Sequence, residues 1–202
     1  MATRLAEATA EIARRDTVMA GLIERLGPPK LRSRQQPDAF AALVRAIVYQ
    51  QLAGAAASAI HRRFVAMFDG NLTPEAVLAV PESRIRQAGM SGAKAASIRD
   101  LAGKVVDGTV PLDRLRRLSD DDIITRLSQV RGIGRWTAEM FLIFQLGRLD
   151  VWPVDDLGVR KGYAIAYRLA ELPSPKKLSA LGERFRPYRT IPAWYCWRAY
   201  IP

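Results

Sequence analysis

Apolar residues recur at intervals of three and four along most of this 202-residue chain, the spacing that places them on one face of a helix. The clearest run follows Asp38 and carries an apolar stripe from Phe40 to Val48. An earlier run begins after Asp16, a suitable N-cap, and stops at Gly27. No sustained stretch alternates with the period of two that strands require. The pattern therefore predicts an all-α protein.

Further helix starts are marked by residues that cap N-termini or open a first turn. Ser119 followed by Asp122 resembles a capping box in which Asp replaces Glu or Gln. From Trp136 to Leu146 the chain is apolar on most sides and then reaches Gly147, which predicts a buried helix. The other predicted starts are Thr73-Pro74, Pro81, Ser91 and Ser174-Pro175.

The charge balance indicates a polyanionic partner. Lys and Arg number 31 against 20 acidic residues, which gives a formal net charge of +11 and a pI near 10.4, so much of the surface field is positive. A membrane surface and a basic protein without a charged partner are the alternatives on charge alone. No run reaches the ~20 apolar residues that span a bilayer, and the N-terminus lacks a signal-peptide pattern. We therefore expect a cytoplasmic protein, nucleoid-associated if bacterial. We also expect a monomer.

Cysteine and histidine usage excludes several kinds of metal site. Cys196 and His61 are the only residues of their types, so neither an internal disulfide nor a cysteine-only cluster can form. A zinc site built from these two residue types is implausible. Cys196 lies in the apolar run A-W-Y-C-W, and its expected role is buried packing.

The segment V-R-G-I-G-R connects two of the predicted helices. Gly132 and Gly134 can adopt positive φ and bring the backbone close to a ligand, while Ile133 anchors the turn in the core. The amides at the start of the next helix then face outward, where the helix dipole favours an anion such as a DNA phosphate. A simple two-glycine connection is the alternative. Arg131 and Arg135 on either side favour the phosphate interpretation.

Several motifs in order carry a family resemblance. I-V-Y-Q-Q-L-A-G, G-M-S-G-A-K, L-x-x-V-R-G-I-G-R-W-T-A and V-W-P-V-D-D-L-G extend over about Asp38 to Trp197. Together they resemble the helix-hairpin-helix DNA glycosylases, most closely the bacterial 3-methyladenine DNA glycosylase II type. The resemblance implies two helical subdomains that flank a DNA-binding cleft, with the helix-hairpin-helix at about 123–146. It implies neither an iron–sulfur cluster nor an N-terminal β-domain.

The resemblance also implies a domain organisation. We expect one subdomain from residues 1–37 together with 153–202, and a central subdomain from residues 38–152.

Of the acidic pair Asp155 and Asp156, the resemblance assigns the catalytic role to Asp156. Breaking an N-glycosidic bond leaves positive charge on deoxyribose, which a nearby carboxylate stabilises in a partly dehydrated site. The carboxylate can also position or deprotonate water. The pair follows Pro153 and Val154 at a predicted helix start, where the dipole favours ionisation but where Asp is also a common N-cap. We expect one of the two to cap and the other to catalyse.

Trp136 determines the expected reaction. Bifunctional relatives such as the endonuclease III branch have a lysine there, whose amine forms a Schiff base with the sugar. Because tryptophan cannot do this, the resemblance implies hydrolysis that leaves an abasic site. Its π face would favour electron-poor, cationic alkylated purines, although core packing is the alternative role. The resemblance adds Trp197 and Tyr49 as base-pocket residues.

The resemblance assigns DNA contacts and a wedge that enters the duplex as the base flips out. The wedge aligns with Gln51, and a shift of one residue would make it Leu52. The family's hairpin often binds a monovalent cation, Na+ or K+, through backbone carbonyls, and no other cofactor is required. The carbonyls correspond to Ser128, Val130 and Ile133, and the DNA-binding residues to Gly132, Ile133, Gly134, Arg135 and Thr137.

The sequence therefore predicts a monofunctional DNA glycosylase of base excision repair that acts on double-stranded DNA with damaged bases. Its expected substrates are alkylated purines, mainly 3-methyladenine and 7-methylguanine. One alternative is a non-catalytic helix-hairpin-helix protein that holds damaged or distorted DNA. Another is a glycosylase for oxidised or mismatched bases, which would share the mechanism and differ in the pocket.

Overall fold

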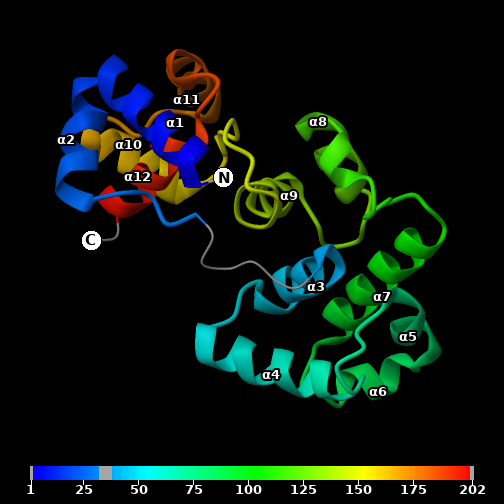
Figure 1. The fold of residues 1–202 in the computed structure, drawn as a ribbon. Helices are drawn as coiled ribbons and strands as arrows, with labels where there is room; N and C mark the ends of the chain where they lie inside the picture. Colours follow the sequence, from blue (N-terminus) through cyan, green and yellow to red (C-terminus); the bar gives the residue numbers. More distant parts are fainter. Residues whose placement is uncertain (1, 32–37, 201–202) are drawn as a thin grey trace. The chain divides into compact units, whose positions relative to one another are not determined.

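The computed structural model describes residues 2–31 and 38–200, and every regular element in these two ranges is a helix (Figure 1). This confirms the all-α prediction. The α-helices are α1 (Ala2–Arg15), α2 (Thr17–Leu26), α3 (Ala39–Tyr49), α4 (Gly54–Ala66), α5 (Pro74–Ala79), α6 (Glu82–Arg86), α7 (Gly92–Val106), α8 (Asp120–Leu127), α9 (Arg135–Phe141), α10 (Leu157–Ala166), α11 (Pro175–Gly182) and α12 (Thr190–Tyr200). Two short 3-10 helices, η1 (Leu115–Arg117) and η3 (Glu183–Phe185), and a π-helix, η2 (Leu142–Leu146), complete the list.

The predicted caps form as expected at most helix starts. The Asp16 carboxylate accepts a hydrogen bond from the Met19 amide at 2.9 Å, and Gly27 ends α2 with φ 71°. Ser119 caps α8, but its hydroxyl also donates to the Asp122 carboxylate at 2.6 Å. A capping box would instead require Asp122 to bind the backbone N–H of the cap residue. The shorter Asp side chain binds the hydroxyl in place of that amide.

The chain divides into two compact units. One comprises residues 38–141, and the other combines the described residues 2–31 with 142–200. The division falls after Phe141, whereas the sequence-based expectation put it after Trp152. The other expected boundary, after residue 37, lies at the edge of residues outside the described ranges. Leu142 and the residues after it belong with the terminal helices, as the stacking of Phe144 on Trp197 shows.

In the central unit, α3 packs against α4, α7 and α9. Its predicted apolar stripe is buried throughout, from Phe40 to Val48. A buried stripe of this kind holds the helix in place through removal of apolar surface from water. The end of α3 and the start of α9 are thereby fixed within one unit.

In the terminal unit, α10 packs most extensively against α12, and α12 also contacts α1 and α2. The approach of α10 to α12 depends on Gly162, because a Cβ at this position would overlap the carbonyl group of Cys196. Cys196 is fully buried, as predicted, and burial raises the pKa of its thiol. This packing fixes the start of α10, where Asp156 lies.

No helix in the described ranges combines the length and apolar character needed to cross a membrane.

Candidate functional site

The hairpin, residues 130–134, connects α8 to α9. Gly132 has φ 77°, a left-handed conformation that favours glycine, and a Cβ there would lie 2.7 Å from the Ser97 hydroxyl oxygen. Gly134 differs from the expectation because its φ is not positive, but a Cβ there would meet nothing within 4 Å. Backbone conformation and packing therefore both require glycine at position 132. Neither requires it at position 134.

Asp100 on α7 contacts the hairpin. Its carboxylate accepts a hydrogen bond from the Arg131 amide at 2.7 Å and forms an ion pair with Lys104 at 2.6 Å. Partial burial raises the pKa of Asp100, but these two partners outweigh that effect and hold it below the ordinary value. The Arg131 amide is thus bonded to the protein itself.

The five predicted DNA-binding residues divide by burial. Gly132, Gly134 and Arg135 are exposed, whereas Ile133 and Thr137 are buried. Arg135 forms an ion pair at 2.9 Å with Glu139, whose side chain is only 3% exposed. Ile133 anchors the hairpin in the core as predicted, and of the five residues only Arg135 has an exposed side chain.

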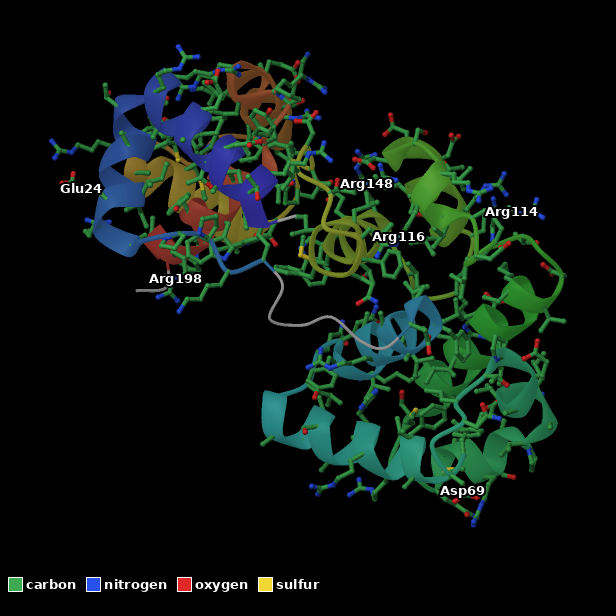
Figure 2. The ribbon with its side chains drawn as sticks, viewed as in Figure 1. Glu24, Asp69, Arg114, Arg116, Arg148 and Arg198 are labelled. Carbon is green, nitrogen blue, oxygen red and sulfur yellow. The ribbon has the colours of Figure 1, made fainter. Side chains whose placement is uncertain are left out.

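Exposed arginines lie on both units. Arg131 lies beside the hairpin glycines. Figure 2 labels Arg114 and Arg116 on the segment before α8 and Arg198 on α12, and all three are exposed. Arginine suits binding to a phosphate backbone because its planar guanidinium donates two parallel hydrogen bonds.

The wedge loop, residues 50–52, follows α3 directly. Gln51 is exposed and has φ 53°, which is rare for a residue with a side chain, and Leu52 is also exposed. The side-chain amide of Gln50 donates to the Gly132 carbonyl at 2.9 Å. The structure therefore brings the wedge loop and the hairpin together, and it leaves both candidate wedge side chains open to solvent.

Asp156 is the N-cap of α10. Its Oδ1 accepts hydrogen bonds from the Val159 amide at 2.8 Å and from the Trp197 indole N–H at 2.9 Å. Asp156 is 9% exposed and counts as buried, while Asp155 is exposed. The expected division of roles between the two residues is therefore wrong on one point, since the cap is Asp156 itself.

Trp197 is set against Asp156 by two neighbours. Its ring stacks on Phe144 of the π-helix, with the ring centroids 5.8 Å apart. Gly158 leaves room for it, because a Cβ there would lie 2.9 Å from Trp197 Cδ1 and 3.1 Å from Asp156 Oδ1. Gly158, the residue that ends V-W-P-V-D-D-L-G, thus allows close packing beside the carboxylate.

The loop that leads to Asp156 is fixed at Trp152. Its indole N–H donates to the Leu178 carbonyl at 2.8 Å, and its ring fills the space left by Gly182, where a Cβ would overlap the indole. Upstream, Asp150 accepts from the Arg189 guanidinium at 2.7 Å. These contacts hold the loop that precedes Asp156 in one conformation, which a precisely placed carboxylate requires.

The other predicted pocket residues lie in the central unit. Trp136, at the start of α9, is 46% exposed, so core packing does not explain it. The Tyr49 ring lies against Arg45, whose guanidinium carbon is 3.9 Å from the ring centroid, and edge-on to His61. Asp156 and Trp197 are the predicted site residues that the structure places in direct contact in the terminal unit.

The three carbonyls expected to bind a monovalent ion belong to the turn between α8 and α9. Ser128 is the C-cap of α8, and the Val130 carbonyl accepts from the Ile133 amide at 3.0 Å. Across the described ranges, no group of three or more His, Cys, Asp and Glu side chains is placed to hold a metal ion.

Sequence reasoning missed the residues that support the site. Gln50 and Lys94 lie inside two motifs that carried the resemblance, but neither motif indicated a contact with another segment. Asp100, Ser97 and Phe144 gave no local signal, because their partners lie tens of residues away in the chain.

Comparisons with known proteins show the family of this chain. Residues 44–187 match the family described as "HhH-GPD superfamily base excision DNA repair protein". The chain is 38% identical over 170 residues to DNA-3-methyladenine glycosylase 1 of Schizosaccharomyces pombe, covering 83% of this chain and 75% of that protein.

Solved structures show the same fold. The 3-methyladenine DNA glycosylase Mag1 of the same yeast, in complex with abasic DNA, superimposes with a TM-score of 0.82 at 36% identity, covering 95% of each chain. A DNA-3-methyladenine glycosidase from Bacillus halodurans gives a TM-score of 0.85 at 37% identity, covering 94% of this chain and 87% of that one. With the matched family segment, the hairpin and Asp156 all in one chain, this protein belongs to the HhH-GPD superfamily of base excision DNA repair proteins.

Proposed function

We propose that this protein is a monofunctional DNA glycosylase that hydrolyses the N-glycosidic bond of alkylated purines, chiefly 3-methyladenine and 7-methylguanine. The observation that carries the proposal is the Asp156 carboxylate, held by two N–H donors at the start of α10. The relatives named as 3-methyladenine glycosylases support the choice of substrate.

Asp156 acts on the sugar. As the bond from C1′ to the purine nitrogen breaks, its electron pair leaves with the base, and a cationic alkylated base departs neutral. The positive charge that develops on C1′ and the ring oxygen is stabilised by the carboxylate. Water then adds to C1′, and Asp156 accepts the proton that the water loses. The products are a free base and an abasic site.

Trp136 gives the base preference and excludes strand cleavage. Its exposed indole presents a π face on which a cationic purine stacks, and it has no amine to form a Schiff base. Borohydride reduction during turnover should trap no covalent complex with DNA. A robust adduct would show that another amine attacks the sugar and would overturn the monofunctional assignment.

The hairpin supplies phosphate binding independently of the chemistry. A monovalent cation at the carbonyls of Ser128, Val130 and Ile133 would add positive charge beside the phosphate, since backbone carbonyls are good ligands for K+ and Na+. Affinity for duplex DNA should then be higher in potassium chloride than in choline chloride of the same ionic strength. Equal affinity in the two salts would remove the ion from the proposal.

The decisive experiment compares the parental protein with Asp156→Asn. Asn keeps an oxygen for the two N–H donors but carries no charge, so release of 7-methylguanine should fall by about 10³-fold while affinity for undamaged duplex stays close to parental. Release at the parental rate by Asp156→Asn would refute the role of this residue. Binding without any base release by the parental protein would favour the non-catalytic alternative.

A panel of duplexes tests the substrate class. Duplexes with methylated adenine, methylated guanine, ethenoadenine and hypoxanthine should be processed in an order that favours the cationic bases. A preference for oxidised or mismatched bases would keep the mechanism and replace the substrate. Sedimentation of the free protein and its DNA complex tests the expectation of a monomer.

A further inference from the structure

A side-chain amide links the wedge loop to the hairpin. Gln50, the C-cap of α3, places its Nε2 2.9 Å from the Gly132 carbonyl oxygen and 3.4 Å from the Thr137 hydroxyl oxygen. Gly132 lies 82 residues further along the chain. The contact therefore connects two segments to which the family resemblance assigns separate tasks, insertion into the duplex and phosphate binding.

Lys94 fixes the same residue from the other side. Its ammonium group, at the start of α7, donates to the carbonyls of Val48 and Gln50 at 2.7 and 2.8 Å. Carbonyls at the end of a helix lack intrahelical partners, and a cation there is favoured by the helix dipole. Both the side chain and the carbonyl of Gln50 are thus held.

The restraint acts directly on the candidate wedge residue. The Gln50 carbonyl belongs to the peptide unit that continues into Gln51, whose left-handed backbone directs an exposed side chain. Left-handed conformations of residues other than glycine cost free energy and persist where surrounding contacts enforce them. Gln50 and Lys94 supply such contacts.

We propose that Gln50 and Lys94 are positioning residues that lock the wedge loop to the hairpin, so that a hairpin seated on a phosphate also sets the place of Gln51. This inference rests on the proposed function. Extruding a base costs free energy because the base must leave the stack, and ordering a loop residue adds a cost in conformational entropy. A loop already ordered on the hairpin avoids that second cost when the base leaves the stack.

The test uses Gln50→Glu, which has nearly the same shape. Ionised glutamate has no proton to donate and repels the Gly132 carbonyl, whereas its protonated form donates again. At pH 7.5 single-turnover release of 7-methylguanine should fall about tenfold or more, the equivalent of one lost hydrogen bond. Relative to the parental protein at each pH, the rate should recover as the pH falls towards 5. A purely structural defect would not recover in this way.

Two further variants make the comparison specific. Gln129→Glu adds the same negative charge at an exposed position next to the hairpin, and at pH 7.5 should show a small loss of affinity with a nearly parental single-turnover rate. Lys94→Met keeps the apolar stem and removes the donor, and should reproduce the pH 7.5 defect. Since both act through one loop, the double variant should lose little more than either single variant.

A binding measurement separates failure of this inference from failure of the proposed function. The parental protein should prefer a duplex with a tetrahydrofuran abasic-site analogue over undamaged duplex, and Gln50→Glu at pH 7.5 should lose most of that preference. If the parental protein releases no base but this preference behaves as stated, the enzyme assignment fails and the link between loop and hairpin stands.

Parental rates and parental preference in both Gln50→Glu and Lys94→Met would overturn the link and leave the glycosylase assignment intact. Circular-dichroism melts check that each variant folds. If Gln50→Glu does not fold, Lys94→Met decides the matter by the same two measurements.

Discussion

The indole N–H of Trp197 and the backbone N–H of Val159 meet on a single oxygen, Oδ1 of Asp156. The N-cap bond fixes the carboxylate to α10, and the indole bond fixes its direction relative to α12. Trp197 was predicted as a base-pocket residue, and that role stays a prediction. The structure shows its indole N–H as a donor to the carboxylate.

Replacing Trp197 with Phe keeps an aromatic ring beside Phe144 and removes the donor. A hydrogen bond to a charged group contributes about 1.5–3 kcal/mol, so the single-turnover rate of base release should fall by roughly 10- to 100-fold. Trp194→Phe is the matched control, because Trp194 lies on the same helix and packs edge-on against Tyr195. If Trp197→Phe keeps the parental rate, the indole N–H has no orienting function.

Trp136→Ala tests the π face. Because Trp136 is 46% exposed, its loss should change the free energy of unfolding little. Removing a cation–π contact of about 0.5–2 kcal/mol should lower the rate for cationic 7-methylguanine by roughly 2- to 30-fold relative to that for neutral hypoxanthine. The ratio of these two rates for Trp136→Phe should lie between the ratios for the parental protein and for Trp136→Ala. An unchanged ratio of the two rates would assign the base preference to another residue.

Gly162→Ala tests the crossing of α10 and α12. The added methyl group overlaps the Cys196 carbonyl, a backbone atom that moves only if the helices separate, so urea unfolding should show a loss of about 2–3 kcal/mol. Gly21→Ala is the control in the same unit. Its Cβ would meet nothing within 4 Å, and alanine in a helix should add about 0.5–1 kcal/mol. Equal effects of the two changes would contradict the close approach.

The helices were predictable where a cap and an apolar stripe coincided. Asp16 and Asp38 cap their helices as the sequence indicates, because both signals are local. The unit boundary after Phe141 was not predicted, since nothing local distinguishes it within an apolar run. The packing of Phe144 on Trp197, 53 residues further on, places the rest of that run with the terminal helices.

The site residues that lie within a recognised sequence motif were predictable. Gly132 needs its positive φ, as predicted, while Gly134 does not, and the difference depends on backbone torsions that a two-glycine pattern cannot show. That Asp156 itself caps α10 was missed, because choosing the cap between two adjacent aspartates depends on where α10 begins. The contacts of Gln50, Lys94 and Asp100 arise only when α3, α7 and the hairpin pack together.

Asp100→Asn tests how the hairpin is held. Because its pKa lies below the ordinary value in the folded protein, the ionised carboxyl stabilises the fold above the unfolded-state pKa near 4, and this contribution is lost as the pH falls through the lower folded-state value. At pH 7 the variant should lose about 1 kcal/mol, and the Arg131 amide should exchange its hydrogen faster. The difference from the parental protein should shrink below pH 4, where the parental carboxyl also becomes neutral. Asp113→Asn, on an exposed pair with Arg114, should change neither quantity. A deficit for Asp100→Asn that stays constant down to pH 2.5 would show that shape, and not charge, holds the hairpin.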